Sequence, residues 1–133
     1  MDKLKIGFEV TDNWKNGNFR EFIQGLIKSN NFDVYIISND DISSYIYSVG
    51  EQLQLPNNRV IVTNFTNDKI NEIITNNINI YFDNLQHVVT QIDAETNCYA
   101  ILINILPNRY LTIPTYQVEF FRILTELNEK ECK

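Results

Sequence analysis

Short apolar runs alternate with segments of helical periodicity along most of the chain, and this alternation limits the fold more than any other feature. Residues 4–10, 34–37, 60–62, 78–82 and 99–106 have the apolar character of strands. Between and after them, apolar residues recur every three or four positions, which predicts helices over 18–29, from 40 or 41 to 53, from 66 or 67 through the apolar positions 70, 73 and 74, over 85–92 and over 116–127. We therefore expect one domain over residues 1–133 with a doubly wound, mostly parallel five-stranded α/β sheet and helices on both faces.

Polar residues mark several of the predicted helix ends. The expected positions are Asn30 and Asn31 at the end of the first helix, Asp40 or Asp41 at the cap of the second, and Thr66 or Asn67 at the cap of the third.

The composition is that of an ordinary globular domain, with 44% hydrophobic and 21% charged residues among 133. A net charge of −6 argues against nucleic-acid binding over a broad surface. No apolar run approaches the roughly 18 to 20 residues of a membrane span, and the start of the chain lacks a signal-peptide pattern. Two cysteines, Cys98 and Cys132, are too few for a disulfide framework or a zinc site, so we expect reduced thiols and a cytoplasmic location.

Asn and Ile each make up about a seventh of the chain, well above typical usage. This bias is typical of an AT-rich bacterium or one of its viruses. It leaves open that the chain is an accessory or structural protein of such a virus.

Polar residues also end the predicted strands, where a parallel sheet binds its ligands. Glu9 lies near the end of the first strand, Ser38 and Asn39 follow the second, and Asp83 follows the fourth. Lys69 lies near the start of the helix between the third and fourth strands. A hydroxyl, a lysine and an acid at one sheet edge predict a site for phosphate and magnesium.

In this order, the segments resemble the four motifs of the haloacid dehalogenase-like (HAD) superfamily of phosphatases, over residues 5–106. The family's Asp-x-Asp-x-Thr motif corresponds here to Glu9-Val10-Thr11-Asp12-Asn13. The second motif is matched by Ser38 and the third by Lys69. The fourth, an acidic pair, is matched by Asp83 followed by Asn84.

The resemblance implies a role for each matched position. Glu9 would occupy the position of the nucleophile and Thr11 that of the general acid–base. Phosphate would be bound by Ser38, Asn39 and Lys69. Glu9, Asp83 and the Thr11 backbone carbonyl would hold Mg²⁺ weakly. However, Glu is one methylene longer than Asp, and Thr offers no proton near neutral pH, so the predicted chemistry is degenerate.

Many members of this family carry a cap domain inserted after the first or third strand. Neither position leaves room for one here, and an open site favours a large partner over a small metabolite. The first hypothesis is a degenerate member that binds a protein partner or a phosphorylated ligand. The alternative is a slow magnesium-dependent phosphatase that acts on an exposed phosphomonoester, such as a nucleotide or a nucleic-acid end.

Purely structural interpretations remain open for the same residues. Glu9 fits a polar strand end, Lys69 a solvated helix position, and Asp83 an N-cap. The single histidine, His87, is typical of a surface or capping residue. Trp14 and Tyr45 are candidates for the lining of a groove, but aromatic side chains are more often part of a core.

Overall fold

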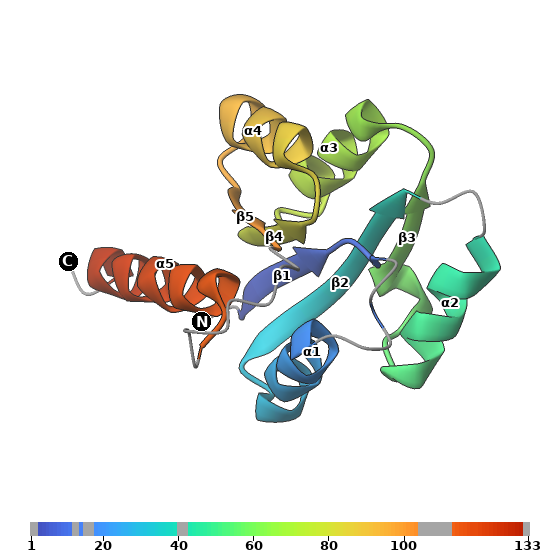
Figure 1. Cartoon of the computed structure of the whole chain (residues 1–133), viewed down its shortest axis with the longest axis horizontal. Coiled ribbons are helices and arrows are strands. Elements are labelled where there is room, and N and C mark those ends of the chain that lie inside the picture. Colours follow the sequence, from blue (N-terminus) through green and yellow to red (C-terminus); the bar gives the residue numbers. More distant parts are fainter. Residues whose placement is uncertain (1–2, 12–13, 15–17, 40–42, 104–112, 132–133) are drawn as a thin grey trace.

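The computed structural model of the chain describes residues 3–11, 14, 18–39, 43–103 and 113–131, without the side chains of 130 and 131. Strands and helices alternate along it (Figure 1). The strands are β1 (Leu4–Phe8), β2 (Phe32–Asn39), β3 (Val60–Thr63), β4 (Ile80–Asp83) and β5 (Tyr99–Leu102). The helices are α1 (Asn18–Ser29), α2 (Ser43–Gln52), a 3₁₀ turn at Asn57–Arg59, α3 (Thr66–Thr75), α4 (Gln86–Glu95) and α5 (Thr115–Glu131).

The five strands form one parallel sheet in the order β3-β2-β1-β4-β5. The chain first adds strands on one side of β1 and then crosses to add β4 and β5 on the other side. The switch point of the sheet therefore lies between β1 and β4, where a doubly wound sheet binds its ligands. This architecture confirms the predicted fold class.

Side-chain alternation along the strands assigns a different set of helices to each face of the sheet. Phe8, Ile36 and Phe82 belong to the core cluster that α1, α2 and α5 complete. The neighbouring residues Ile37 and Tyr81 belong to a second cluster with α3 and α4. Figure 1 shows α3 and α4 together on one side of the sheet and α1 and α2 on the other.

Several element bounds differ from the predicted ones for identifiable reasons. The first strand ends at Phe8 and not at residue 10, because the Val10 N–H donates to the Ser38 side chain at 3.2 Å and not to a neighbouring strand. The fourth strand begins at Ile80, because the Ile78 N–H still closes the end of α3 on the Ile73 carbonyl at 3.0 Å. Asn30 ends α1 as predicted, in the left-handed region at φ 58°.

The predicted caps had mixed outcomes. Phe65, and not Thr66 or Asn67, occupies the N-cap of α3, without a side-chain cap bond. The predicted caps Asp40 and Asp41 lie outside the described residues, as do residues 104–106 of the predicted fifth strand and Cys132. Cys98 is a buried free thiol directly before β5.

Among the helices of the described residues, none combines the length and the apolar character that crossing a membrane requires.

Candidate functional site

Four predicted site residues meet at the carboxyl edge of the sheet, next to its switch point. Glu9 follows β1, Ser38 lies near the end of β2, Asp83 ends β4, and Lys69 lies in the first turn of α3. We call these four residues the charge cluster. The Glu9 N–H continues the pairing of β1 with β4 by donating to the Phe82 carbonyl at 2.9 Å, which places Glu9 beside Asp83.

Lys69 joins the two carboxylates of the charge cluster. Its Nζ donates to Oδ2 of Asp83 at 2.7 Å and also to Oε2 of Glu9. The remaining Asp83 oxygen, Oδ1, accepts the Leu85 N–H at 3.0 Å. This bond holds the turn into α4, whose N-cap is Leu85, so Asp83 does not itself occupy the N-cap position.

The Glu9 carboxylate has two further donors at the end of β2. Ser38 Oγ donates to Oε1 at 2.6 Å, and the Asn39 backbone N–H donates to Oε2 at 3.3 Å. The Asn39 side chain turns to β3, where its Oδ1 accepts a hydrogen bond from Thr63. Glu9 therefore spans from β1 to β2 and to α3, and is more than a polar residue at a strand end.

The charge cluster is removed from water. The exposed fractions are 0% for Ser38 and Asp83, 1% for Lys69 and 7% for Glu9. Lys69 is thus not the solvated helix residue that its residue type favoured. Burial raises the pKa of the Glu9 carboxyl above its usual value, although Lys69 and Ser38 act to lower it.

The Tyr81 ring lies below the Lys69 ammonium group. Tyr81 was not among the predicted site residues. Its ring centroid lies 5.6 Å from Lys69 Nζ, and its hydroxyl donates to the Ile37 carbonyl. To reach β2 from β4, the ring passes over Gly7 of β1, where an added Cβ would stand 2.9 Å from Tyr81 Cδ2. Burial, followed by the nearby Glu9 and Asp83 charges, raises the pKa of Tyr81 well above its usual range, so the hydroxyl remains a donor.

Thr11 lies apart from these contacts. Its side chain is buried, and its carbonyl oxygen, the predicted metal ligand, accepts the Trp14 N–H at 3.1 Å. Within the described residues, no hydrogen bond joins Thr11 to the charge cluster. Asn13 lies outside the described residues.

Magnesium binding stays a prediction. Glu9 and Asp83 do turn one oxygen each toward a common point, but that point holds the Lys69 ammonium. In the described residues, no three His, Cys, Asp or Glu side chains are grouped as metal ligands. The donor set in this arrangement fits an ammonium group better than Mg²⁺, which prefers six oxygen ligands.

Other candidate residues do not join the charge cluster. Trp14 is buried and stacks on Phe8 with ring centroids 5.2 Å apart, and Tyr45 packs against the same core. His87 is exposed in the first turn of α4, as expected of a surface residue.

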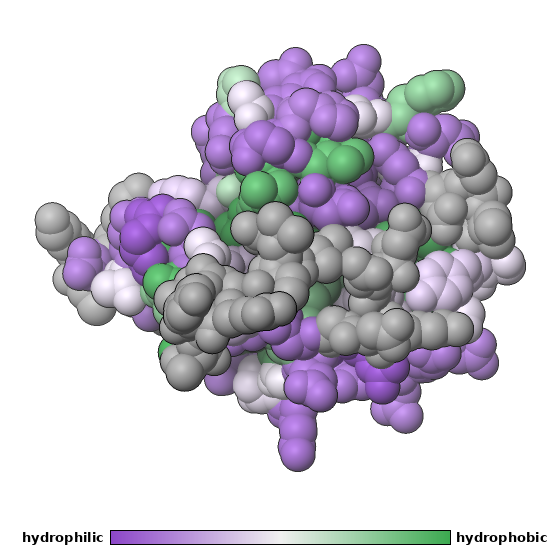
Figure 2. Space-filling view, viewed as in Figure 1, coloured by the Kyte–Doolittle hydropathy of each residue, from purple (hydrophilic) through white to green (hydrophobic). Residues whose placement is uncertain are grey.

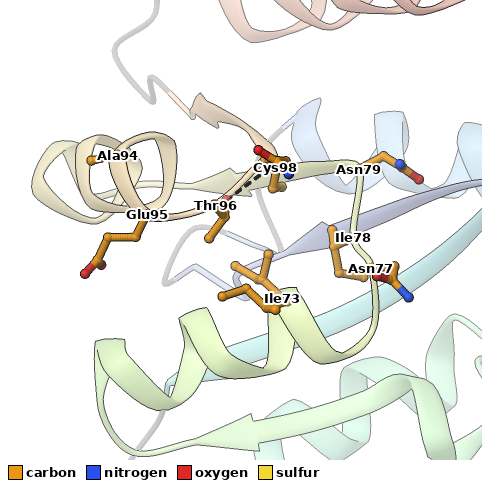
Figure 3. Close-up of a pocket in the computed structure, with 10 residues that line it drawn as sticks. Ile73, Asn77, Ile78, Asn79, Ala94, Glu95, Thr96 and Cys98 are labelled. Atoms are coloured by element: carbon orange, nitrogen blue, oxygen red, sulfur yellow. Dashed lines mark hydrogen bonds between the residues drawn. The ribbon is translucent and has the colours of Figure 1, made fainter.

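A hollow of about 470 Å³ lies at the opposite, amino-terminal edge of β4 and β5. Figure 3 shows Ile73 and Ile78 on one side of it, and Thr96 next to Cys98 on the other. The Cys98 N–H donates to Thr96 Oγ1 at 3.0 Å, and burial raises the pKa of the thiol. The hollow therefore has a protonated thiol and no contact with the charge cluster.

No protein-family model matches the chain, and no curated protein matches it significantly in sequence.

Proposed function

We propose that the chain is a non-catalytic member of the HAD-like superfamily that works by binding a protein partner at the carboxyl edge of its sheet. The proposal combines the order of the four motifs with the meeting of Glu9, Ser38, Lys69 and Asp83 beside the switch point. Independent polar strand ends would not be expected to share one ammonium group. A common ancestral site explains why they do.

The state of the Glu9 carboxylate supports the loss of catalysis. A nucleophile must reach its substrate, but Glu9 is 7% exposed and both of its oxygens accept hydrogen bonds. Its raised pKa further lowers the fraction in the nucleophilic, ionised form. Thr11, at the acid–base position, supplies no proton near neutral pH.

Exposed apolar side chains at the same edge favour a protein partner. Phe65 and Leu85 stand at the N-caps of α3 and α4 with exposed fractions of 71% and 47%. Elsewhere, Figure 2 shows a mostly hydrophilic surface over α3 and α4, with hydrophobic side chains at its margins. Apolar side chains that are exposed together are typical of protein-binding surfaces.

A magnesium-dependent phosphatase is the second candidate. The observation in its favour is that Glu9 and Asp83 each present one oxygen to the same point, next to the Ser38 hydroxyl. In that case Mg²⁺ would have to displace the Lys69 ammonium from at least one carboxylate.

A phosphatase assay separates the two candidates. Wild type, Glu9→Gln and Asp83→Ala are incubated with generic and nucleotide phosphomonoesters, with and without Mg²⁺. We expect the turnover of wild type to be no higher than that of the two variants. Magnesium-dependent turnover in wild type that is absent in both variants would reject the non-catalytic proposal.

The binding surface is tested by a matched pair of variants. Phe65→Ser/Leu85→Ser should lose a partner that wild type captures, whereas Tyr47→Ser, which changes a 54% exposed side chain on α2, should keep it. Equal capture by both variants would place the partner surface elsewhere.

A further inference from the structure

We infer that Ser38, Asn39 and Lys69 form an oxyanion pocket that the chain fills with its own Glu9 carboxylate. Truncation of Glu9 would then open this pocket to small oxyanions from solution. The inference concerns anion binding at the proposed site and does not depend on whether the protein catalyses a reaction.

Three donors converge on the carboxylate from two separate parts of the chain. The hydroxyl of Ser38 and the N–H of Asn39 come from the end of β2, and the ammonium of Lys69 comes from α3. A hydroxyl, a backbone N–H and an ammonium on one acceptor group are the donors that bind free carboxylates and phosphates. The pocket is therefore defined by its donors and not by the identity of the anion.

The Ser38 hydroxyl is fixed in its donating role. Its oxygen accepts the Val10 N–H at 3.2 Å, and its proton goes to Glu9 Oε1 at 2.6 Å. Ser38 is fully buried, so in wild type its proton goes to Glu9 and not to bulk water. Loss of the carboxylate leaves a directed donor facing a vacated space.

The atoms that the substitution removes determine the size of that space. Glu9→Ala removes Cγ, Cδ and the two carboxylate oxygens, which are the four heavy atoms of acetate. Glu9 is the most exposed member of the charge cluster, so the space adjoins the surface. Acetate is therefore the matched probe for the truncated protein.

The net charge of the charge cluster determines which anions we expect the pocket to bind. In wild type, the two carboxylates and one ammonium sum to −1 when all are ionised, and Glu9→Ala brings the sum to zero. Acetate restores the original charge, whereas dianionic phosphate adds one more negative charge next to Asp83. We expect acetate to bind Glu9→Ala, and phosphate to bind well only when Asp83→Asn is added.

The experiment follows the melting temperature of wild type, Glu9→Ala and Glu9→Ala/Ser38→Ala in sodium acetate, with sodium chloride at equal ionic strength and acetamide as controls. Acetate should raise the melting temperature of Glu9→Ala in a saturable way, with half-saturation on the order of 1–50 mM. The melting temperature of wild type should be the same in acetate as in chloride. Removal of the Ser38 donor should weaken acetate binding about tenfold. Equal responses of wild type and Glu9→Ala, or an equal effect of acetamide, would overturn the inference.

A second measurement applies if Glu9→Ala does not fold in plain buffer. Refolding of Glu9→Ala and Glu9→Ser from denaturant should then give more soluble protein in acetate than in chloride. No gain in acetate for either variant would count against the pocket. Wild-type phosphatase turnover would reject the proposed function alone, whereas absence of an acetate effect would reject this inference alone.

Discussion

Replacement of Lys69 by Met tests whether the charge cluster is a buried ion-paired unit. Met fills a similar volume but leaves the Glu9 and Asp83 carboxylates without their shared cation. Removing one partner from a buried ion pair costs about 3–5 kcal/mol, a large part of the 5–15 kcal/mol that stabilises a typical domain. For a chain of this length, we expect the melting temperature to fall by about 10–20 °C.

Urea unfolding at pH 7 measures the loss directly, with the fluorescence of the single tryptophan, buried Trp14, as the probe. The matched control is Arg122→Met, which removes a cation that is ion-paired to Glu119 and Glu126 but 52% exposed. The control should change the unfolding midpoint much less. A loss below about 1 kcal/mol for Lys69→Met, as for a surface ion pair, would refute the reasoning.

Adding Glu9→Gln to Lys69→Met should recover part of the loss, because an amide can accept from Ser38 without carrying a charge. The loss should also shrink at acid pH. Lys69 lowers the pKa of Glu9, so without it the carboxyl takes up a proton at higher pH. A loss that is constant from pH 4 to pH 8 would contradict this account.

Burial raises the folded-state pKa of Glu9 above its ordinary value of about 4.5. Its contribution to stability is therefore fully present below that pH and declines as pH rises through the folded-state pKa. This decline in urea-derived stability should be absent in Glu9→Gln. In urea unfolding, Gly50→Ala should lose about 1–3 kcal/mol of stability, because the new Cβ would stand 2.5 Å from Val60 Cγ2. Gly25→Ala, with no atom within 4 Å of the new Cβ, should instead stabilise α1 by up to about 1 kcal/mol. Glu9→Asp/Thr11→Asp should gain magnesium-dependent phosphatase activity that neither single variant reaches, and a folded double variant without activity would argue against a retained catalytic frame.

The sequence predicted the sheet well because periodicity depends on which face of each element is buried. Short apolar runs that alternate with segments of helical period 3.6 together permit few arrangements other than a doubly wound sheet. Strand ends were less predictable. Whether Val10 continues β1 depends on the competing Ser38 hydroxyl, which comes from a residue 28 positions away.

The site was predicted at the level of its location but not of its contacts. Carboxyl ends of parallel strands must share an edge, so Glu9, Ser38 and Asp83 could be placed near one another from sequence alone. The direction and burial of Lys69 could not, because a lysine in the first turn of a helix is usually solvated. Nor did the pattern reveal Tyr81, whose position depends on the missing side chain of Gly7 on the adjacent strand.

The length of one side chain connects the fold of this protein to its proposed loss of catalysis. Glu9 leaves a backbone that is held between Phe82 of β4 and Ser38 of β2, so its carboxylate position is set by the number of methylenes. An aspartate would end about an ångström short, a displacement that decides whether reacting groups meet. With Glu, the carboxylate reaches the Ser38, Asn39 and Lys69 donors and satisfies them. With an aspartate at position 9, the three donors would be available for a ligand. With Glu9, which is one methylene longer, the protein supplies the anion itself.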